Sequence, residues 1–197
     1  MNVKKNLGWI IPVAILIVIV LWAIGGYNGM VSMDEEVQGK WANVETQYQR
    51  RADLIPNLVN TVKGYATHEK TTLEEVVKAR SEATQIKVDP TNLTDKQIAE
   101  YQKAQGNVSA ALGKLLMVAE NYPQLKANEN FLELQSQLEG TENRINVARK
   151  DFNDAAQQYN VAIRKFPKSM LAGIFGFDKK AYFEAESGAE KAPEVKF

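Results

Sequence analysis

Residues 128–166 read NENFLELQSQLEGTENRINVARKDFNDAAQQYNVAIRKF, and this stretch decides the fold class. Steps of alternately three and four residues fall on apolar or small side chains for five heptads: Phe131, Leu134, Leu138, Thr141, Ile145, Ala148, Phe152, Ala155, Tyr159, Ala162 and Phe166. A 3.5-residue period of this length predicts a long helix packed in a left-handed bundle. Pro123 precedes the predicted helix and Pro167 ends it.

Two further tracts carry the same helical spacing. The first runs over residues 98–122, after a turn-like segment and a possible capping box formed by Thr94 and Gln97. The second is one long tract over residues 28–83, in which Pro56 is expected to kink the helix, although a break there is the alternative. With short connections between them, these tracts predict an all-α fold, an antiparallel bundle of long helices.

A membrane anchor is predicted ahead of the bundle. Residues 7–26 read LGWIIPVAILIVIVLWAIGG and carry no charge, with Trp9 and Trp22 near the two ends. Twenty helical residues span about 30 Å, which matches the hydrocarbon core of a bilayer. A cleaved signal peptide is the alternative, but its apolar run would be shorter. We therefore expect a retained transmembrane helix in contact with membrane lipid.

The flanking charges predict an orientation in a bacterial cytoplasmic (inner) membrane. Lys4 and Lys5 precede the span, whereas the residues that follow it are acidic, at positions 34–36. The positive-inside rule places residues 1–6 in the cytoplasm and everything after the span outside. The expected organisation is a bundle domain over residues 27–183 and a disordered tail over residues 184–197.

Composition argues against several functional classes. Lysine and arginine total 24, as do aspartate and glutamate, so the chain lacks the excess of positive charge typical of nucleic-acid binders. There is no cysteine, and His68 is the single histidine; an HExxH zinc motif fails because position 72 is Thr. Phosphate-binding glycine loops and the nucleophile elbow are also missing. We expect a protein that is not an enzyme and that uses no metal or cofactor.

Arg51 is the charged residue that stands out, because it is in step with the apolar positions Val44 and Tyr48. A charge buried there needs a partner, which Glu45, Glu139 or Glu142 could supply. Polar residues also enter the best heptad seam at positions 141–144. They are expected to fix helix register, with binding of a small polar ligand as the alternative reading. The candidate interaction or register residues are Trp41, Tyr48, Arg51, Glu142, Asn143, Phe175 and Phe177.

Two apolar features suggest self-association. Trp41 and Tyr48 follow the span so closely that neighbouring copies would hold these rings at the same height. Residues 170–177 read MLAGIFGF, which is too short to cross a bilayer and too apolar to leave exposed. This segment must fold back on its own bundle, enter lipid, or cover another subunit.

Several local strings resemble the LemA family of bacterial membrane proteins. They include WANVE at 41–45, QRRADLIPNLV at 49–59, VKGYA at 62–66 and LEGTEN at 138–143, and shorter matches fall at 27–28, 68–69, 122–123, 125–127, 148–149, 159–160 and 166–167. The resemblance implies one N-terminal transmembrane helix followed by a four-helix bundle. It implies no reaction. A membrane zinc metalloprotease is a possible partner by family association alone.

These observations leave two hypotheses for the function. The first is a membrane-anchored scaffold or adaptor of the bacterial envelope that forms homo-oligomers, as long helical seams without a catalytic set suggest. The second is an extracytoplasmic ligand-binding sensor that signals through its anchor. A sensor needs a concave pocket with a few convergent polar groups.

Overall fold

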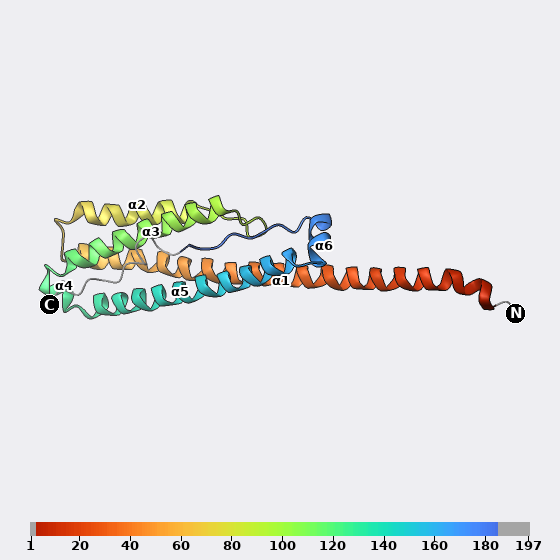
Figure 1. The fold of residues 1–197 in the computed structure, drawn as a ribbon. Coiled ribbons are helices and arrows are strands. Elements are labelled where there is room, and N and C mark those ends of the chain that lie inside the picture. The colour runs from red at the N-terminus through yellow and green to blue at the C-terminus, as the bar shows by residue number, and fades with distance from the viewer. Residues whose placement is uncertain (1–2, 185–197) are drawn as a thin grey trace, which may run out of the picture.

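The computed structural model describes residues 3–184, and within this range the chain is all-helical, without a strand (Figure 1). Its elements are α1 (Val3–Lys63), α2 (Lys70–Gln85), α3 (Asp95–Ala119), α4 (Pro123–Lys126), α5 (Glu129–Arg164) and α6 (Lys168–Phe175). The predicted cap is present, because Thr94 and Gln97 form a complete capping box at the start of α3. At the start of α5, Asn128 is the cap and accepts a hydrogen bond from the Phe131 N–H.

Helix α1 is 61 residues long and continues through both Pro12 and Pro56. The prediction that Pro56 does not break the helix is confirmed. The single tract predicted over residues 28–83 is wrong, because α1 ends at Lys63 and a turn over residues 64–69 separates it from α2. The buried apolar positions on both sides of the turn share one core, so the apolar spacing continues through a reversal of the chain.

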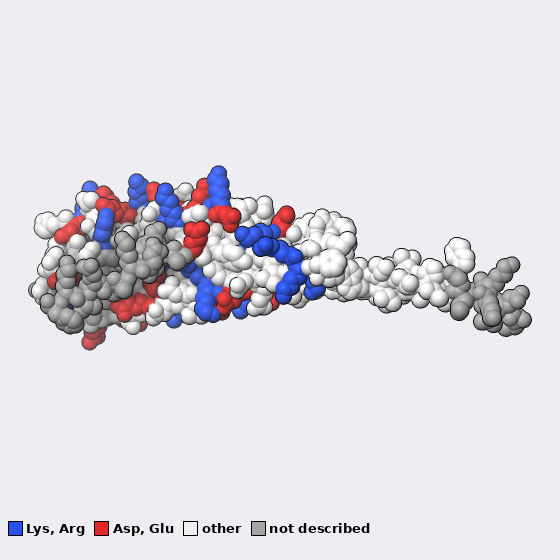
Figure 2. All heavy atoms as spheres, in the orientation of Figure 1, with Lys and Arg blue, Asp and Glu red and all other residues white. Residues whose placement is uncertain are grey.

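The N-terminal part of α1 stands alone. Its large side chains from Trp9 to Ile24 are mostly exposed, and Figure 2 shows this part as a narrow stem of uncharged side chains. Among the described residues, α1 is the one helix long and apolar enough to cross a membrane. Beyond the stem, α5 lies along α1, while α2 and α3 lie beside each other on another side (Figure 1).

The packed helices enclose two apolar clusters. The cluster nearer the stem centres on Trp41, which contacts the rings of Tyr101, Phe152 and Phe183. The distal cluster holds Ile55, Leu58, Val62, Ala66, Leu73, Val76, Ala79, Ala83, Val108, Ala111, Leu112, Leu115, Ala119, Leu125, Phe131 and Leu138. The boundary between them falls on α1 between Tyr48 and Ile55, which is the position of Arg51.

Helix α6 folds back onto the end of the stem. Leu171 packs so closely on Gly26 that a Cβ there would lie 2.8 Å from Leu171 Cδ1, and the rings of Phe175 and Phe177 contact Tyr27. Gly176 ends α6 with a φ of 73°, which favours glycine. Of the three possibilities for residues 170–177, the structure shows back-folding on the same chain for one face of the helix; the other face stays exposed.

The segment after α6, residues 177–184, is an extended strap that returns along the domain. Two asparagines of α5, seven residues apart, hold it: Asn160 pairs with the backbone N–H and C=O of Lys180, and Asn153 does the same for Phe183. The ring of Phe183 stacks on Trp41 with an interplanar angle of 11°. The strap therefore completes the core nearer the stem. Of the tail predicted over 184–197, residues 185–197 lie outside the described range.

Candidate functional site

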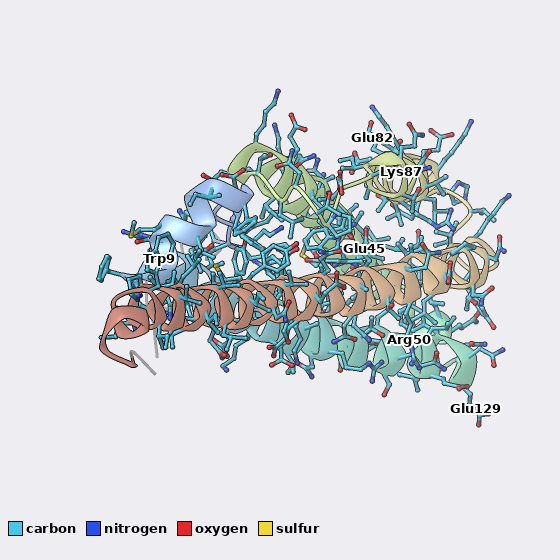
Figure 3. The ribbon with its side chains drawn as sticks, turned by 90° about the vertical axis from the view of Figure 1, so that its right-hand side faces the viewer. Trp9, Glu45, Arg50, Glu82, Lys87 and Glu129 are labelled. Atoms are coloured by element: carbon cyan, nitrogen blue, oxygen red, sulfur yellow. The ribbon has the colours of Figure 1, made fainter. Side chains whose placement is uncertain are left out.

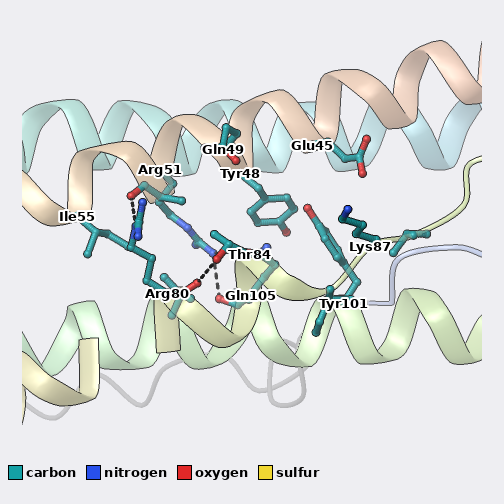
Figure 4. A pocket seen from close by; sticks show the side chains of 15 residues that line it. Glu45, Tyr48, Gln49, Arg51, Ile55, Arg80, Thr84, Lys87, Tyr101 and Gln105 are labelled. Atoms are coloured by element: carbon teal, nitrogen blue, oxygen red, sulfur yellow. Dashed lines mark hydrogen bonds between the residues drawn. The ribbon is translucent and has the colours of Figure 1, made fainter. Parts of the chain in front are cut away.

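A cavity of about 320 Å³ lies between α1, α2 and α3, and polar side chains converge on it (Figure 4). Tyr48 and Arg51 reach it from α1, Arg80 from α2, and Tyr101 and Gln105 from α3. Figure 3 shows Glu45 on the side of α1 that faces α2 and α3, at the same cavity. These positions follow from the heptad spacing, which turns every third or fourth side chain of each helix inward.

Arg51 is the centre of this site, with only 2% of its surface exposed. Its Nη1 donates to Ser109 Oγ at 2.7 Å and to Glu142 Oε1 at 2.6 Å, and its Nη2 donates to Gln105 Oε1 at 2.7 Å and to the Gln105 carbonyl at 3.0 Å. The guanidinium also lies 5.1 Å from the centroid of the Tyr48 ring. One side chain of α1 is thus tied to both α3 and α5.

The Arg51 network forms a polar layer between the two apolar clusters. Tyr48, Tyr101 and Ile145 belong to the cluster nearer the stem, and Ile55, Val108 and Leu138 belong to the distal one. Of the partners of Arg51, Gln105 falls between these positions on α3 and Glu142 between those on α5, and Ser109 lies next to Val108. A shift of α5 or α3 by one turn would take away part of the hydrogen-bond partners of the buried guanidinium, which is costly.

The electrostatics of the cavity disfavour further negative charge at its end nearer the stem. Burial raises the pKa of the Tyr101 hydroxyl well above its usual range, and Tyr48 and Glu45 add to this rise. Burial also raises the pKa of Glu45, partly offset by the Trp41 side chain. Arg80 uses its Nε to donate to the Ala52 carbonyl at 2.6 Å, so part of this second guanidinium is engaged in joining α2 to α1.

A second buried cation lies at the stem end of the domain. Lys180 of the strap pairs with Asp34 Oδ1 at 2.8 Å, donates to the Thr91 carbonyl at 2.7 Å, and lies 5.7 Å from the Tyr159 ring centroid. Burial raises the pKa of Tyr159 to about 12. Lys180 was not predicted, because its strap has no helical period. The signal that could have found the strap is the pair Asn153 and Asn160 on α5, which bind its backbone.

The structure distributes the seven candidate residues over four places. Tyr48, Arg51 and Glu142 meet in the polar layer, and of the three acidic partners suggested for Arg51 the structure selects Glu142. Trp41 is fully buried in the neighbouring cluster, Asn143 is exposed on α5, and Phe175 and Phe177 lie against Tyr27. The expectation that Trp41 and Tyr48 meet a neighbouring copy is wrong, because both rings lie inside their own domain, with 0% and 5% exposed.

Within the described residues, no group of three or more histidine, cysteine, aspartate or glutamate side chains is arranged to hold a metal ion. His68 is exposed in the turn between α1 and α2.

Comparison with known proteins shows to which family this chain belongs. The model of the LemA family matches residues 40–197. The chain belongs to the LemA family. The match covers Arg51, Glu142 and the strap, so the polar layer and the strap both lie in the part of the chain that the family model describes.

The relatives found by sequence are named magnetosome and LemA proteins. The chain is 30% identical over 181 residues to Magnetosome protein MamQ 2 of Paramagnetospirillum magneticum, covering 83% of this chain and 66% of that protein, so it spans just under two thirds of that relative's length. It is 29% identical over 197 residues to Magnetosome protein MamQ of Magnetospirillum gryphiswaldense, covering 91% and 72%. Protein LemA of Metamycoplasma hominis is 23% identical over 162 residues, covering 82% and 70%. The chain is a membrane-associated helical protein of the LemA family.

The polar layer predicts the effect of replacing Arg51. Arg51→Met removes the donor to the buried Gln105 Oε1, whereas Glu142, whose side chain is 39% exposed, can return to water. We expect helix content to be unchanged and the free energy of unfolding to fall by about 2–3 kcal/mol. Urea unfolding of the full chain in detergent, followed by circular dichroism, measures this.

Arg50→Met is the matched control, because Arg50 is the adjacent residue and is exposed. Its effect should stay within about 0.5 kcal/mol. Equal stability of the Arg51→Met and Arg50→Met variants would show that the polar layer does not stabilise the domain.

Proposed function

We propose that this protein is a non-enzymatic scaffold or adaptor that holds a rigid helical domain at a fixed position beside a membrane. The single observation that carries the proposal is that α1 passes without interruption from the apolar stem into the core of the domain. Met30, Val37 and Trp41, the first fully buried apolar residues after the stem, lie on this same helix. A domain joined in this way cannot swivel freely about its anchor, as it would on a flexible linker.

The proposed architecture of the domain is an antiparallel four-helix bundle of α1, α2, α3 and α5. The order of cross-helix pairs supports it. Lys40 pairs with Asp151 and Arg51 pairs with Glu142, so partners on α5 descend in number as those on α1 rise. Lys114 of α3 pairs with Glu75 of α2, which joins the other two helices. Such a bundle is a stiff object suited to positioning a partner.

The proposed orientation puts the domain outside the cytoplasm of a bacterial inner membrane. The support is the charge asymmetry around the stem, with Lys4 and Lys5 on one side and Asp34, Glu35 and Glu36 on the other. A reporter that is active only outside the cytoplasm, fused after Phe197, should be active. Activity of a matched reporter that works only in the cytoplasm would contradict this orientation.

Self-association is proposed to use the stem, since Trp41 and Tyr48 are not available for it. Gly25 and Gly29 lie one turn apart where the stem enters the domain, and a Cβ at either position would meet nothing within 4 Å. Two small residues at this spacing let helix backbones approach closely, as in pairs of membrane-spanning helices. The partner helix proposed here is the stem of a second copy.

A second candidate function is a ligand-binding sensor, favoured by the cavity at Arg51. The cavity has the concave shape and the polar groups that a sensor requires. Against it, Arg51 already donates to Ser109, Gln105 and Glu142, so a ligand would have to replace protein partners. A small molecule that raises the melting temperature of the native chain but not of Arg51→Met would favour the sensor over the scaffold.

Mass determination tests the scaffold proposal. We expect the full chain in mild detergent and in lipid nanodiscs to have an assembled mass of two or more copies. The double variant Gly25→Leu with Gly29→Leu should shift this mass toward one copy, because the added side chains hold the stems apart. Native mass spectrometry and mass photometry give the distribution directly.

Gly39→Leu is the matched control, because Gly39 also has open space around it but lies within the domain part of α1. It should leave the assembled mass unchanged. A native chain that stays monomeric at high concentration in both detergent and nanodiscs would contradict self-association; an assembly unaffected by the double variant would contradict the stem as its interface.

A further inference from the structure

Helix α6 has one buried face and one apolar face with nothing packed on it. Leu171 and Ala172 are buried against the rest of the chain. On another side of the helix, Met170 is 61% exposed and Ile174 is 73% exposed, one turn apart, and Phe166, which precedes the helix, is 81% exposed. Such a row of large apolar side chains marks a contact surface, because soluble proteins rarely expose apolar patches of this kind.

The position of α6 indicates what its exposed apolar face contacts. Leu171 rests on Gly26 and Phe175 on Tyr27, so α6 lies level with the end of the apolar stem. Figure 1 shows α6 standing across the direction of α1. If α1 crosses a membrane, a helix lying across it at this level lies in the plane of the membrane surface. The exposed face of α6 is then continuous with the apolar surface of the stem, which ends at Ile24.

The charges around α6 fit the same position. Along the sequence from 164 to 179, Arg164, Lys165, Lys168 and Lys179 stand against one acidic residue, Asp178. Asp34 of α1 also lies nearby and pairs with Lys180. Figure 2 shows a band of lysine and arginine side chains on the domain side of the uncharged end. An apolar face bordered by cations is typical of helices that lie in the headgroup region, where cations attract anionic lipids.

We propose that α6 is an interfacial helix that docks on the bilayer surface beside the stem, with Phe166, Met170 and Ile174 inserted at the boundary between headgroups and acyl chains. The domain then contacts the membrane at two points, the stem and α6, and cannot tilt freely about the stem. This inference rests on the membrane anchoring of α1 in the proposed function, and the experiment separates the failure of one from the failure of the other.

Single cysteines test the proposal cleanly, because the chain contains none. The full-length variants Ile174→Cys and Met170→Cys carry an environment-sensitive nitrobenzoxadiazole label in nanodiscs of phosphatidylcholine and phosphatidylglycerol. Lipids with a doxyl group near the headgroup, or deep in the acyl chain for the stem control, quench only labels in contact with lipid at that depth. Ile15→Cys in the stem is the positive control, and Val147→Cys, an exposed apolar position on α5, is the negative control.

We expect the labels at positions 170 and 174 to lose most of their fluorescence to the shallow quencher, and the label at 147 to lose almost none. Replacing Lys165 and Lys168 together by glutamine should reduce the quenching at 174 in nanodiscs that contain phosphatidylglycerol. Quenching at 15 without quenching at 170 and 174 would overturn the docking of α6 while leaving the anchor intact.

Two further outcomes would each contradict the docking of α6 on the bilayer. Labels at 170 and 174 that are shielded from water but not quenched by lipid would show that protein, such as a second copy, covers this face, and would overturn the proposal. Absence of quenching at all positions, including 15, would contradict the membrane anchoring on which both proposals rest.

Discussion

One helix, α1, exposes apolar side chains along the stem and buries them in the core of the domain, and the rest of the structure depends on this change. From Trp9 to Ile24 its apolar side chains point outward, whereas from Met30 onward they point inward to a core. The reversal is possible because other elements pack on α1 only after the stem, beginning with Leu171 on Gly26. Helix α5 then covers α1 along most of the domain (Figure 1). Membrane contact and domain packing are therefore two parts of one hydrogen-bonded element.

Within the domain, the buried Arg51 ties α1 to both α3 and α5. Apolar clusters alone tolerate a shift of one helix along another, because one buried aliphatic residue can replace its neighbour. Arg51 does not tolerate it, since its partners come from fixed positions on α3 and α5. Separating the partners of a buried ion pair is costly, because the groups left behind lose their hydrogen bonds. The polar layer and the strap around Lys180 thus fix the domain at two levels along α1.

The sequence predicted those parts of the structure that depend on periodicity and on local caps. It predicted the α5 heptads, the cap at Thr94, the passage of α1 through Pro56 and a partner for Arg51. It failed at the turn after Lys63, because the apolar spacing of α1 and α2 continues across the reversal. It also missed the strap, because Asn153 and Asn160 pair with backbone groups of an extended segment that has no period. The burial of Trp41 and Tyr48 depends on that segment and on α3, which spacing along α1 alone does not reveal.

The continuity of α1 can be measured directly by amide hydrogen exchange of the full chain in nanodiscs. The comparison is between residues 27–36, where the stem enters the domain, and residues 41–48 in the core. An unbroken helix predicts that both segments exchange equally slowly, because neither contains a frayed end. Fast exchange in residues 27–36 with slow exchange on both sides would reveal a flexible joint, and would contradict the account of a domain held rigidly by its anchor.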